Sequence, residues 1–427
     1  MKADIIFIGG GLNYVGAIFL ARVGKKVILI EKNLNHLGGT CLNNGCIPSK
    51  NLLHRTKTIF ESQENIFDGE IKLNLKKLNS QINNTISTLS KAIHSQITSS
   101  NVEIIQGEGI LLDDKKVKVN EVIYEVDYIV LGTGAKPFIP QNIEIDYKSI
   151  ITSNEIFKLE KFPKEIIIYG SGAIGLEFAS FFAINGVKTS LMYRKDTISK
   201  KYHSKITQKL EEQLKEIGIT LIPNTPITSA KVEKNKVIIN ENIKTEMLLV
   251  ATGRIPNIQT KANIEIEKGI VTDEYFQTSI SNIFAIGDCN GKLELAHAAR
   301  SEVLNVVDNI LGKKQKLNLD NIPKFIYTIP LSYASVGIKS DKEVVYPLKA
   351  LGITSAIKGS ENGIVVLYAD KENFLTGAEI LMPNAEEIIS TLAIIINSEL
   401  DKNTILKTTF PHPVFSEILD YATRKIK

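Results

Sequence analysis

A pattern of strand, glycine-rich turn, helix and strand occurs twice in this chain, and it constrains the fold more than any other feature. The first copy lies within residues 4–31 and the second within residues 165–194. In both, an apolar run without alternation precedes the glycines, which is typical of a strand buried on both faces of a parallel sheet. One glycine turn is weak evidence, but two in the same frame predict two nucleotide-binding domains.

The first copy contains an irregular turn. Its strand, helix and second strand are predicted at Ile5–Ile8, Tyr14–Val23 and Val27–Ile30, with Gly9 and Gly11 in the turn. Glu31 stands about 20 positions beyond the glycines, where an acid is typical of a ribose contact. Tyr14 stands where the third glycine is usual. We therefore expect the turn to be reshaped around Asn13, or to bind its nucleotide more weakly.

The second copy keeps its three glycines but has no acid at the end of its second strand. The turn contains Gly170, Gly172 and Gly175, and the following helix is predicted to reach about Ile184. The strand after it ends at Tyr193 and Arg194. An arginine there can accept the 2′-phosphate of NADP, which favours NADP over NAD. The alternative is a solvent-exposed basic loop, since Lys195, Lys200 and Lys201 follow.

Three shorter motifs each follow an apolar strand. They are LGTGAKP at residues 131–137, with Thr133 and Gly134; ATGRIPN at residues 251–257, with Gly253; and AIGDCNG at residues 285–291, with Gly287 and Asp288. The first two are interpreted as the segments by which the chain leaves the two nucleotide domains, paired with each other. A long surface helix is predicted over residues 74–100, because its apolar residues recur at helical spacing.

These signals predict an α/β protein with two Rossmann-like dinucleotide-binding domains and a C-terminal α+β domain. The first domain is predicted at residues 1–142 and resumes at 258–316; the second occupies 143–257. From about residue 317 short strands with turns are followed by amphipathic helices, which predicts a separate domain over 317–427.

Composition and charge exclude several classes of protein. Of the 427 residues 43% are apolar, and the net charge is only +4, with scattered basic residues, so no nucleic-acid partner is expected. No apolar stretch is long enough to predict a membrane span. Three cysteines are too few for a secreted disulfide framework, which favours a reducing cytoplasm. No second cysteine pair exists, so no metal site is predicted.

Two of the cysteines, Cys41 and Cys46, lie close together in GGTCLNNGCIPSK at residues 38–50. Five steps of regular helix rise about 7.5 Å, which exceeds the roughly 4.4–6.8 Å usual between the Cα atoms of a disulfide. The backbone must therefore be distorted for the bond to form, and Gly45 permits this. A strained short loop is easily reduced, and a helix predicted from Ser49 to Phe60 would favour a thiolate at its start. Two buried bystander thiols are the alternative.

His412 is a candidate base because it lies between two prolines, on a segment that cannot be helical. Glu417 follows five residues later, close enough to orient the imidazole ring and to stabilise its charged form. Ser416 is predicted to cap a final helix that buries Ile418, Leu419 and Ala422. An ordinary surface histidine is the alternative.

The motifs together resemble those of the pyridine nucleotide–disulfide oxidoreductases, and among them the dihydrolipoamide dehydrogenases. The resemblance rests on the cysteine segment, ATGRIPN, AIGD, LAHAA at residues 295–299 and HPVFSE at residues 412–417. The chain departs at Asn44, where a small apolar residue is expected, and at Val414, where a threonine is usual. The resemblance implies bound FAD and NAD(P), a homodimer and a redox-active disulfide.

Roles for individual residues follow from this resemblance. Cys46 would lie against the flavin, and Cys41 would react with the disulfide substrate. Lys50 would lie near the reactive flavin nitrogen with Glu177 beside it, and Asp288 and Glu31 would bind the ribityl chain and the adenosine ribose. His412 would reach the cysteines of the other subunit. The remaining cofactor-binding positions are Gly9, Gly11, Thr40, Thr133, Gly134, Gly170, Gly172, Gly175, Arg194, Gly253 and Gly287.

The leading hypothesis is therefore an FAD-dependent enzyme that passes electrons between NAD(P) and a small dithiol or a lipoyl-carrying protein. An alternative is an NADPH-dependent reductase of another small disulfide, similar to glutathione reductase, which Arg194 favours. A third is a flavoprotein binding module that has lost its catalytic activity, which the irregular first turn favours.

Overall fold

The computed structural model describes residues 2–64 and 66–427. These fall into two compact units. The first comprises Met1–Ser49, Asn79–Phe138 and Gly253–Leu319, and the second comprises Lys50–Leu78, Ile139–Thr252 and Asp320–Lys427. No helix in the described part of the chain is long and apolar enough to cross a membrane.

The first unit is built on a seven-stranded sheet with the order β3-β2-β1-β6-β5-β4, and β17 pairs with β6. The strands are β1 (Lys2–Ile8), β2 (Val27–Glu31), β3 (Glu103–Gln106), β4 (Gly109–Leu111), β5 (Lys116–Val119), β6 (Val122–Leu131) and β17 (Ile283–Ala285). The neighbouring strands β3, β2, β1, β6 and β17 are all parallel to one another, while β5 pairs with β6, and β4 with β5, in antiparallel orientation. The predicted first strand–helix–strand frame is therefore confirmed.

Both faces of this sheet are buried, as the continuous apolar strands predicted. Ile5 and Phe7 of β1 pack in one cluster with α1 (Asn13–Arg22) and α8 (Ala296–Ile310). Ile6 and Ile8 point to the opposite face and pack with Val117 and Val119 of the antiparallel strands. Successive side chains of a strand alternate between faces, so both sets must be apolar when both faces are covered.

Three further helices lie near the start of the chain. They are α2 (Gly39–Asn44), α3 (Cys46–Ser62) and α4 (Leu75–Ser99). The last confirms the long helix predicted over residues 74–100. A short antiparallel pair, β7 (Ala135–Pro137) and β16 (Arg254–Pro256), joins the LGTGAKP and ATGRIPN motifs, which confirms that these two exits are paired.

The second unit contains a five-stranded parallel sheet with the order β11-β10-β9-β15-β8. Its strands are β8 (Ile150–Ile151), β9 (Glu165–Tyr169), β10 (Lys188–Met192), β11 (Thr220–Ile222) and β15 (Met247–Val250); its helices are α5 (Ser153–Ile156), α6 (Ala173–Ile184) and α7 (Ser204–Glu216). A small antiparallel sheet is formed by β12 (Ala230–Glu233), β13 (Lys236–Ile239) and β14 (Ile243–Thr245). The second predicted frame is confirmed by β9, α6 and β10.

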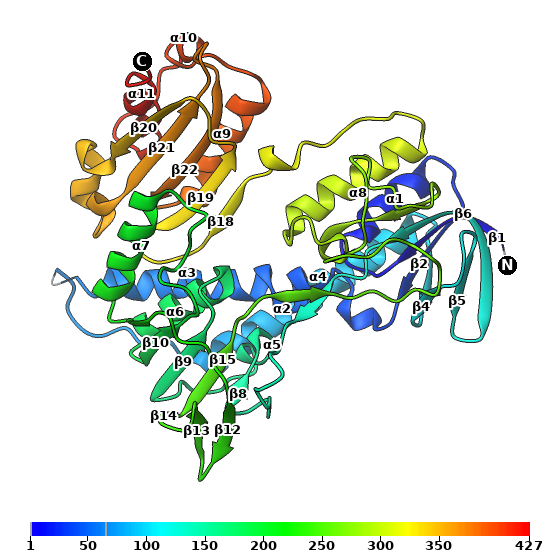
Figure 1. Ribbon diagram of the computed structural model, residues 1–427, viewed down its shortest axis with the longest axis horizontal. Coiled ribbons are helices and arrows are strands. Elements are labelled where there is room, and N and C mark those ends of the chain that lie inside the picture. Colours follow the sequence, from blue (N-terminus) through cyan, green and yellow to red (C-terminus); the bar gives the residue numbers. More distant parts are fainter. Residues whose placement is uncertain (1, 65) are drawn as a thin grey trace. The chain divides into compact units, whose positions relative to one another are not determined.

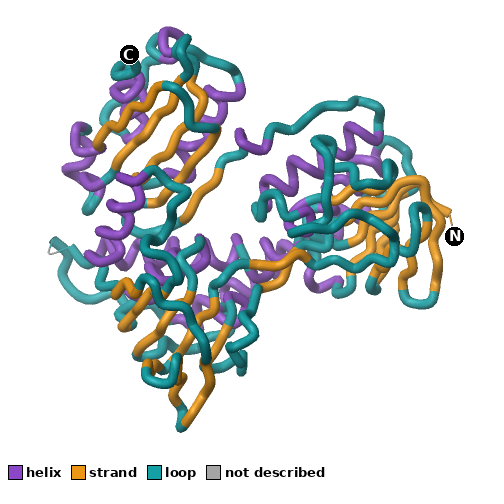
Figure 2. The backbone as a smooth tube through the Cα atoms, in the orientation of Figure 1, coloured by secondary structure: helices purple, strands orange, loops and turns teal. Residues whose placement is uncertain are grey.

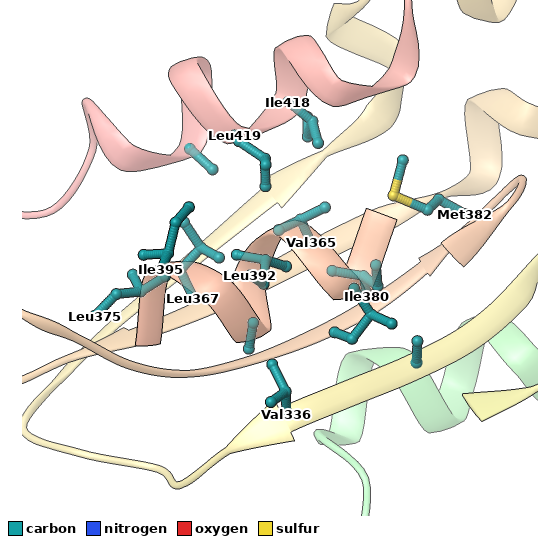
Figure 3. Packing of buried hydrophobic residues seen from close by; sticks show 14 of the residues in the cluster. Val336, Val365, Leu367, Leu375, Ile380, Met382, Leu392, Ile395, Ile418 and Leu419 are labelled. Atoms are coloured by element: carbon teal, nitrogen blue, oxygen red, sulfur yellow. The ribbon is translucent and has the colours of Figure 1, made fainter. Parts of the chain in front are cut away.

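The same unit ends in an antiparallel sheet with the order β18-β19-β22-β21-β20, whose strands are coloured orange in Figure 2. They are β18 (Lys324–Ile326), β19 (Ser332–Gly337), β20 (Lys342–Pro347), β21 (Ile364–Ala369) and β22 (Leu375–Met382), followed by α9 (Ala385–Asn397), α10 (Lys402–Ile405) and α11 (Ile418–Thr423). Val336, Leu367 and Ile380 pack with α9 and α11 in one apolar cluster (Figure 3). The α+β character predicted from residue 317 onward is confirmed.

Candidate active site

The first glycine turn places the carboxylate of Glu31 against the backbone of the turn. The Gly10 N–H donates to Glu31 Oε2 at 2.7 Å, and the Asn33 N–H donates to Oε1 at 3.0 Å. Gly9, Glu31, Glu108, Thr133 and Asn257 share the lining of one pocket in this unit. The structure thus brings together three residues that the sequence placed at a nucleotide, namely Gly9, Glu31 and Thr133.

Asn13 fills the space where the turn departs from the usual pattern. Its side chain is fully buried, and Nδ2 donates to the carbonyl of Ile8 at the end of β1 at 3.1 Å. Oδ1 is also buried and has no hydrogen-bond partner among the described residues. The helix begins with a tight bond from the Val15 N–H to Leu12 O at 3.1 Å. Asn13 therefore ties the start of α1 to the end of β1, as a turn reshaped around it requires, and weaker nucleotide binding stays a prediction.

The loop that presents Asp288 is held by a buried acid. Glu302 on α8 is 0% exposed, and its Oε2 accepts from the Gly287 N–H at 2.6 Å and from Asn290 Nδ2 at 2.9 Å. Burial raises the pKa of Glu302 and also that of Asp288, which the nearby Arg254 guanidinium opposes. Glu302 was not predicted from the sequence, although an acid on the apolar side of a helix is a signal for such a residue.

Gly45 interrupts the helix that carries the cysteines. Its backbone has φ −139° and ψ −119°, so α2 ends at Asn44 and α3 begins at Cys46. A Cβ added to Gly45 would lie 2.8 Å from the carbonyl oxygen of Thr40 and 3.2 Å from Cys41 Cα. Only glycine therefore lets the start of α3 fold back towards Cys41. The predicted distortion is confirmed, but α3 starts three residues earlier than expected.

The two cysteines lie in different surroundings. Cys41 is half-buried within α2, whereas Cys46 is exposed at the first position of a 17-residue helix. The positive end of the helix dipole stabilises a thiolate there. The third cysteine, Cys289, is fully buried, and burial raises the pKa of its thiol to about 11. Cys289 is therefore an inert thiol at neutral pH.

Lys50, one helical turn after Cys46, forms an ion pair with Glu177 of α6. Lys50 Nζ lies 2.5 Å from Glu177 Oε1, which also accepts from the Tyr327 N–H at 2.9 Å. The ammonium group lies 5.5 Å from the ring centroid of Phe325 and 5.4 Å from that of Tyr327. Phe325 lies in β18 and Tyr327 directly follows it, and neither ring was predicted from the sequence. Together with Glu177 they hold the ammonium group of Lys50 in place.

The second glycine turn is closely packed. A Cβ added to Gly175 would lie 1.8 Å from the carbonyl oxygen of Gly170, so glycine is required where α6 crosses the end of β9. Gly172 caps α6 with extended backbone. Beyond β10, Tyr193 is buried, and burial raises its pKa to about 12. Arg194 and Lys195 are exposed, and neither forms an ion pair with any described residue.

His412 and Glu417 lie together, as the sequence predicted. His412 Nδ1 is 2.8 Å from Glu417 Oε1, and the hydrogen bond from His412 lowers the pKa of Glu417. The His412 side chain is 73% exposed, so its other nitrogen remains accessible. The prediction that Ser416 caps the last helix is wrong. The turn starts at Val414 instead, because the Val414 N–H donates to Glu417 Oε2 at 3.1 Å.

The chain matches a known protein family over most of its length. The family model described as pyridine nucleotide-disulphide oxidoreductase matches residues 3–302, and its dimerisation domain matches residues 322–423. The chain belongs to this family. It is an FAD-dependent disulfide oxidoreductase with a C-terminal dimerisation domain, and its second cofactor is a pyridine nucleotide.

Similar proteins cover nearly the whole chain. A dihydrolipoyl dehydrogenase from Mycoplasma genitalium is 30% identical over 100% of this chain and 98% of its own length. One from Chlamydia pneumoniae is 29% identical over 97% of this chain and 95% of its own length. Two solved structures share the fold. The Cu(II) complex of the HOCl-induced flavoprotein disulfide reductase RclA from Escherichia coli has a TM-score of 0.89 and 23% identity, with 100% of both chains covered. LpdA from Mycobacterium tuberculosis has a TM-score of 0.90 and 22% identity, with 99% of both chains covered.

The residues of the first unit fit the FAD of this oxidoreductase family. The turn at Gly9 leads directly into α1, whose first N–H groups suit a pyrophosphate. Glu31 is fixed by two backbone N–H groups beside the pocket and suits a ribose diol. Asp288 lies beside Arg254, with 3.7 Å between Asp288 Oδ2 and Arg254 Nε. Its carboxylate suits hydrogen bonds from the hydroxyl groups of a polyhydroxyl chain.

Proposed function

We propose that this chain is a dihydrolipoamide dehydrogenase-like enzyme that passes electrons between a small dithiol, or a lipoyl-carrying protein, and NAD(P) through Cys41 and Cys46. The main observation that supports this proposal is the break at Gly45, which places Cys46 at the start of α3 and leaves Cys41 in the preceding helix, α2. This arrangement gives the two thiols different surroundings, as a nucleophile and a leaving group require.

Each cysteine then has a distinct task. In the reducing direction the Cys41 thiolate attacks the substrate disulfide, forms a mixed disulfide and releases one substrate thiolate. Cys46 attacks the Cys41 sulfur, releases the second substrate thiolate and closes the Cys41–Cys46 disulfide, so two electrons leave the enzyme. Bound FAD supplies the two-electron carrier between this pair and the nicotinamide. The position of Cys46 at the start of α3 favours its thiolate form, because the positive end of the helix dipole lies there.

His412 provides the proton transfer. Glu417 holds its Nδ1 at 2.8 Å and leaves the other nitrogen accessible. A neutral imidazole in this setting accepts a proton from a substrate thiol, and the Glu417 carboxylate stabilises the resulting cation. We place this proton transfer in a homodimer, in which His412 of one subunit serves the cysteines of the other. The dimerisation domain supports this arrangement.

We further propose that the pyridine nucleotide is NADP. The exposed cations Arg194 and Lys195 follow β10 after Tyr193, and Asp196, the acid beside them, is paired with Lys200 at 3.0 Å. A 2′-phosphate would meet two cations that have no competing ion pair. The same observation keeps an NADPH-dependent reductase of another small disulfide, similar to glutathione reductase, as the second candidate.

One experiment tests the enzyme proposal. Purified protein reduced anaerobically with NADPH should develop the long-wavelength absorbance of a thiolate–flavin pair, and Cys46→Ser should abolish it. Cys289→Ser is the matched control and should leave the band unchanged, because its thiol is buried and protonated. Turnover with dihydrolipoamide against reduction of oxidised glutathione then separates the two candidate substrates. Protein that retains no flavin after gentle purification would contradict both candidates, whereas bound flavin without turnover of either substrate would favour the inactive flavoprotein binding module.

A further inference from the structure

An acid is buried on the face of the C-terminal sheet that points away from α9. Side chains alternate along each strand, so Ala334, Val336 and Ile380 face the apolar cluster and their neighbours face the other side. Glu379 of β22 is one of those neighbours and is only 5% exposed. A buried carboxylate is costly unless donors surround it.

The donors to Glu379 come from two parts of the unit. Tyr333 Oη donates to its carboxylate at 3.1 Å and Tyr368 Oη at 2.9 Å, both from neighbouring strands. The third donor is the backbone N–H of His203, at 2.8 Å. Lys339 Nζ lies 3.4 Å away. Burial, with the charge of Glu379, raises the pKa of both tyrosines and keeps their hydroxyl groups protonated as donors.

The residues before α7 are fixed by this site as well. The ring of Tyr202 lies on that of Tyr333, with 4.3 Å between centroids. His203 Nδ1 accepts the Lys205 N–H at 3.2 Å and caps α7, while Nε2 lies 3.1 Å from a Glu343 oxygen. Helix α7 packs against β22 (Figure 1). We call Tyr202, His203, Tyr333, Tyr368 and Glu379 the Glu379 anchor.

The anchor holds one end of the basic loop at residues 193–203. The other end is fixed by bonds from Asn224 N–H to Lys195 O at 2.9 Å and from Thr225 N–H to Tyr193 O at 3.0 Å. In the middle, Ser171 in the glycine turn donates through Oγ to Ile198 O at 2.8 Å. The loop is therefore tied to the glycine turn, to the parallel sheet and to the C-terminal sheet.

We infer that the Glu379 anchor positions the basic loop for the 2′-phosphate of the pyridine nucleotide. Arg194, Lys195 and Lys201 carry the charges that would bind it, and none forms an ion pair with another described residue. A flexible loop would lose conformational entropy on ordering around a phosphate, whereas an anchored loop has lost it already. The anchor residues are positioning residues, and the inference rests on the proposed use of NADP.

Variants of the Glu379 anchor should lose affinity for NADPH but not for NADH. Tyr333→Phe removes one donor to Glu379, and Tyr202→Leu removes the ring contact without touching the loop's cations. Both variants should weaken NADPH binding about 5- to 20-fold and leave NADH binding within about twofold, as judged by anaerobic titration of the flavin-loaded enzyme. Tyr346→Phe is the matched control, because Tyr346 stacks on Tyr421 elsewhere on the same sheet.

The outcomes separate this inference from the cofactor proposal. A wild-type enzyme that binds NADH at least as tightly as NADPH contradicts the choice of NADP, and the inference falls with it. A wild type that prefers NADPH, with variants that lose both nucleotides equally, overturns the inference alone, because the anchor then only stabilises the fold. Flavin content and thermal unfolding of each variant show whether it has folded, and Glu379→Gln, which keeps an acceptor, should retain more of the NADPH preference than Glu379→Ala.

Discussion

At the scale of single residues, the chain combines regular family chemistry with one local irregularity. Cys41, Cys46, His412 and Glu417 are the residues that we propose for that chemistry; the two cysteines lie in different surroundings, and Glu417 contacts the ring of His412. Asn13 is the irregularity, since a fully buried amide occupies a turn that usually relies on a third glycine. Its bond to Ile8 O joins the start of α1 to the end of β1, which a glycine could not do.

The first prediction concerns Asn13. Asn13→Asp replaces the donor to Ile8 O by a carboxylate that is buried without a partner, which should destabilise the first unit by about 3–5 kcal/mol and release FAD. Asn13→Gly loses one hydrogen bond but also removes the unpartnered Oδ1, so its unfolding temperature should change little. Flavin absorbance after gel filtration and thermal unfolding measure both effects. Full flavin retention in Asn13→Asp would show that the bond to Ile8 is not needed.

At the scale of secondary-structure elements, the first helix depends on a close approach to α8. Gly16 on α1 lies opposite Val303 on α8, and a Cβ added to Gly16 would lie 2.6 Å from Val303 Cγ2 and 3.1 Å from the ring of Phe7. Helix propensity alone favours alanine over glycine here by about 1 kcal/mol. Packing decides against alanine, because buried neighbours on both sides leave no space.

The second prediction follows from this contact. Gly16→Ala should lower the stability by about 1–3 kcal/mol through overpacking, and Val303→Ala should lower it by about 1–2 kcal/mol through lost burial. The double variant should be more stable than the sum of these losses predicts, since the smaller residue 303 makes room for the new methyl group. Thermal unfolding of the four proteins measures the coupling. Gly352→Ala is the control, because no atom lies within 4 Å of its added Cβ; strict additivity at residues 16 and 303 would refute the contact.

At the scale of the whole molecule, we expect the proposed enzyme to be complete only as a dimer. The candidate base is on a largely exposed histidine at the end of the dimerisation domain, and the cysteines belong to the other compact unit of the chain. A proton transfer between subunits would explain why His412 is held rigidly by Glu417 and yet left open to solvent in a single chain.

The third prediction tests this arrangement by mixing two inactive variants. Cys46→Ser and His412→Ala homodimers should each be inactive in disulfide exchange. A heterodimer isolated through two different tags has one site with both residues intact if His412 acts across the interface, and should recover about half of the wild-type activity per dimer. If His412 acts within its own subunit, both sites of the heterodimer stay inactive, and the proposed arrangement is wrong.

The sequence by itself determined the two nucleotide frames, the α+β end of the chain, the cysteine pair and the proximity of His412 to Glu417. These features are local: they depend on glycine spacing, on apolar strands and on residues a few positions apart. Tertiary structure decided the rest. Glu302 beside Gly287, Phe325 and Tyr327 around Lys50, and Tyr333 and His203 around Glu379 lie far apart in the chain, and only folding brings them together. Even the misplaced cap at Ser416 has this origin, because a carboxylate already bound to His412 also accepts the Val414 N–H and moves the start of the turn.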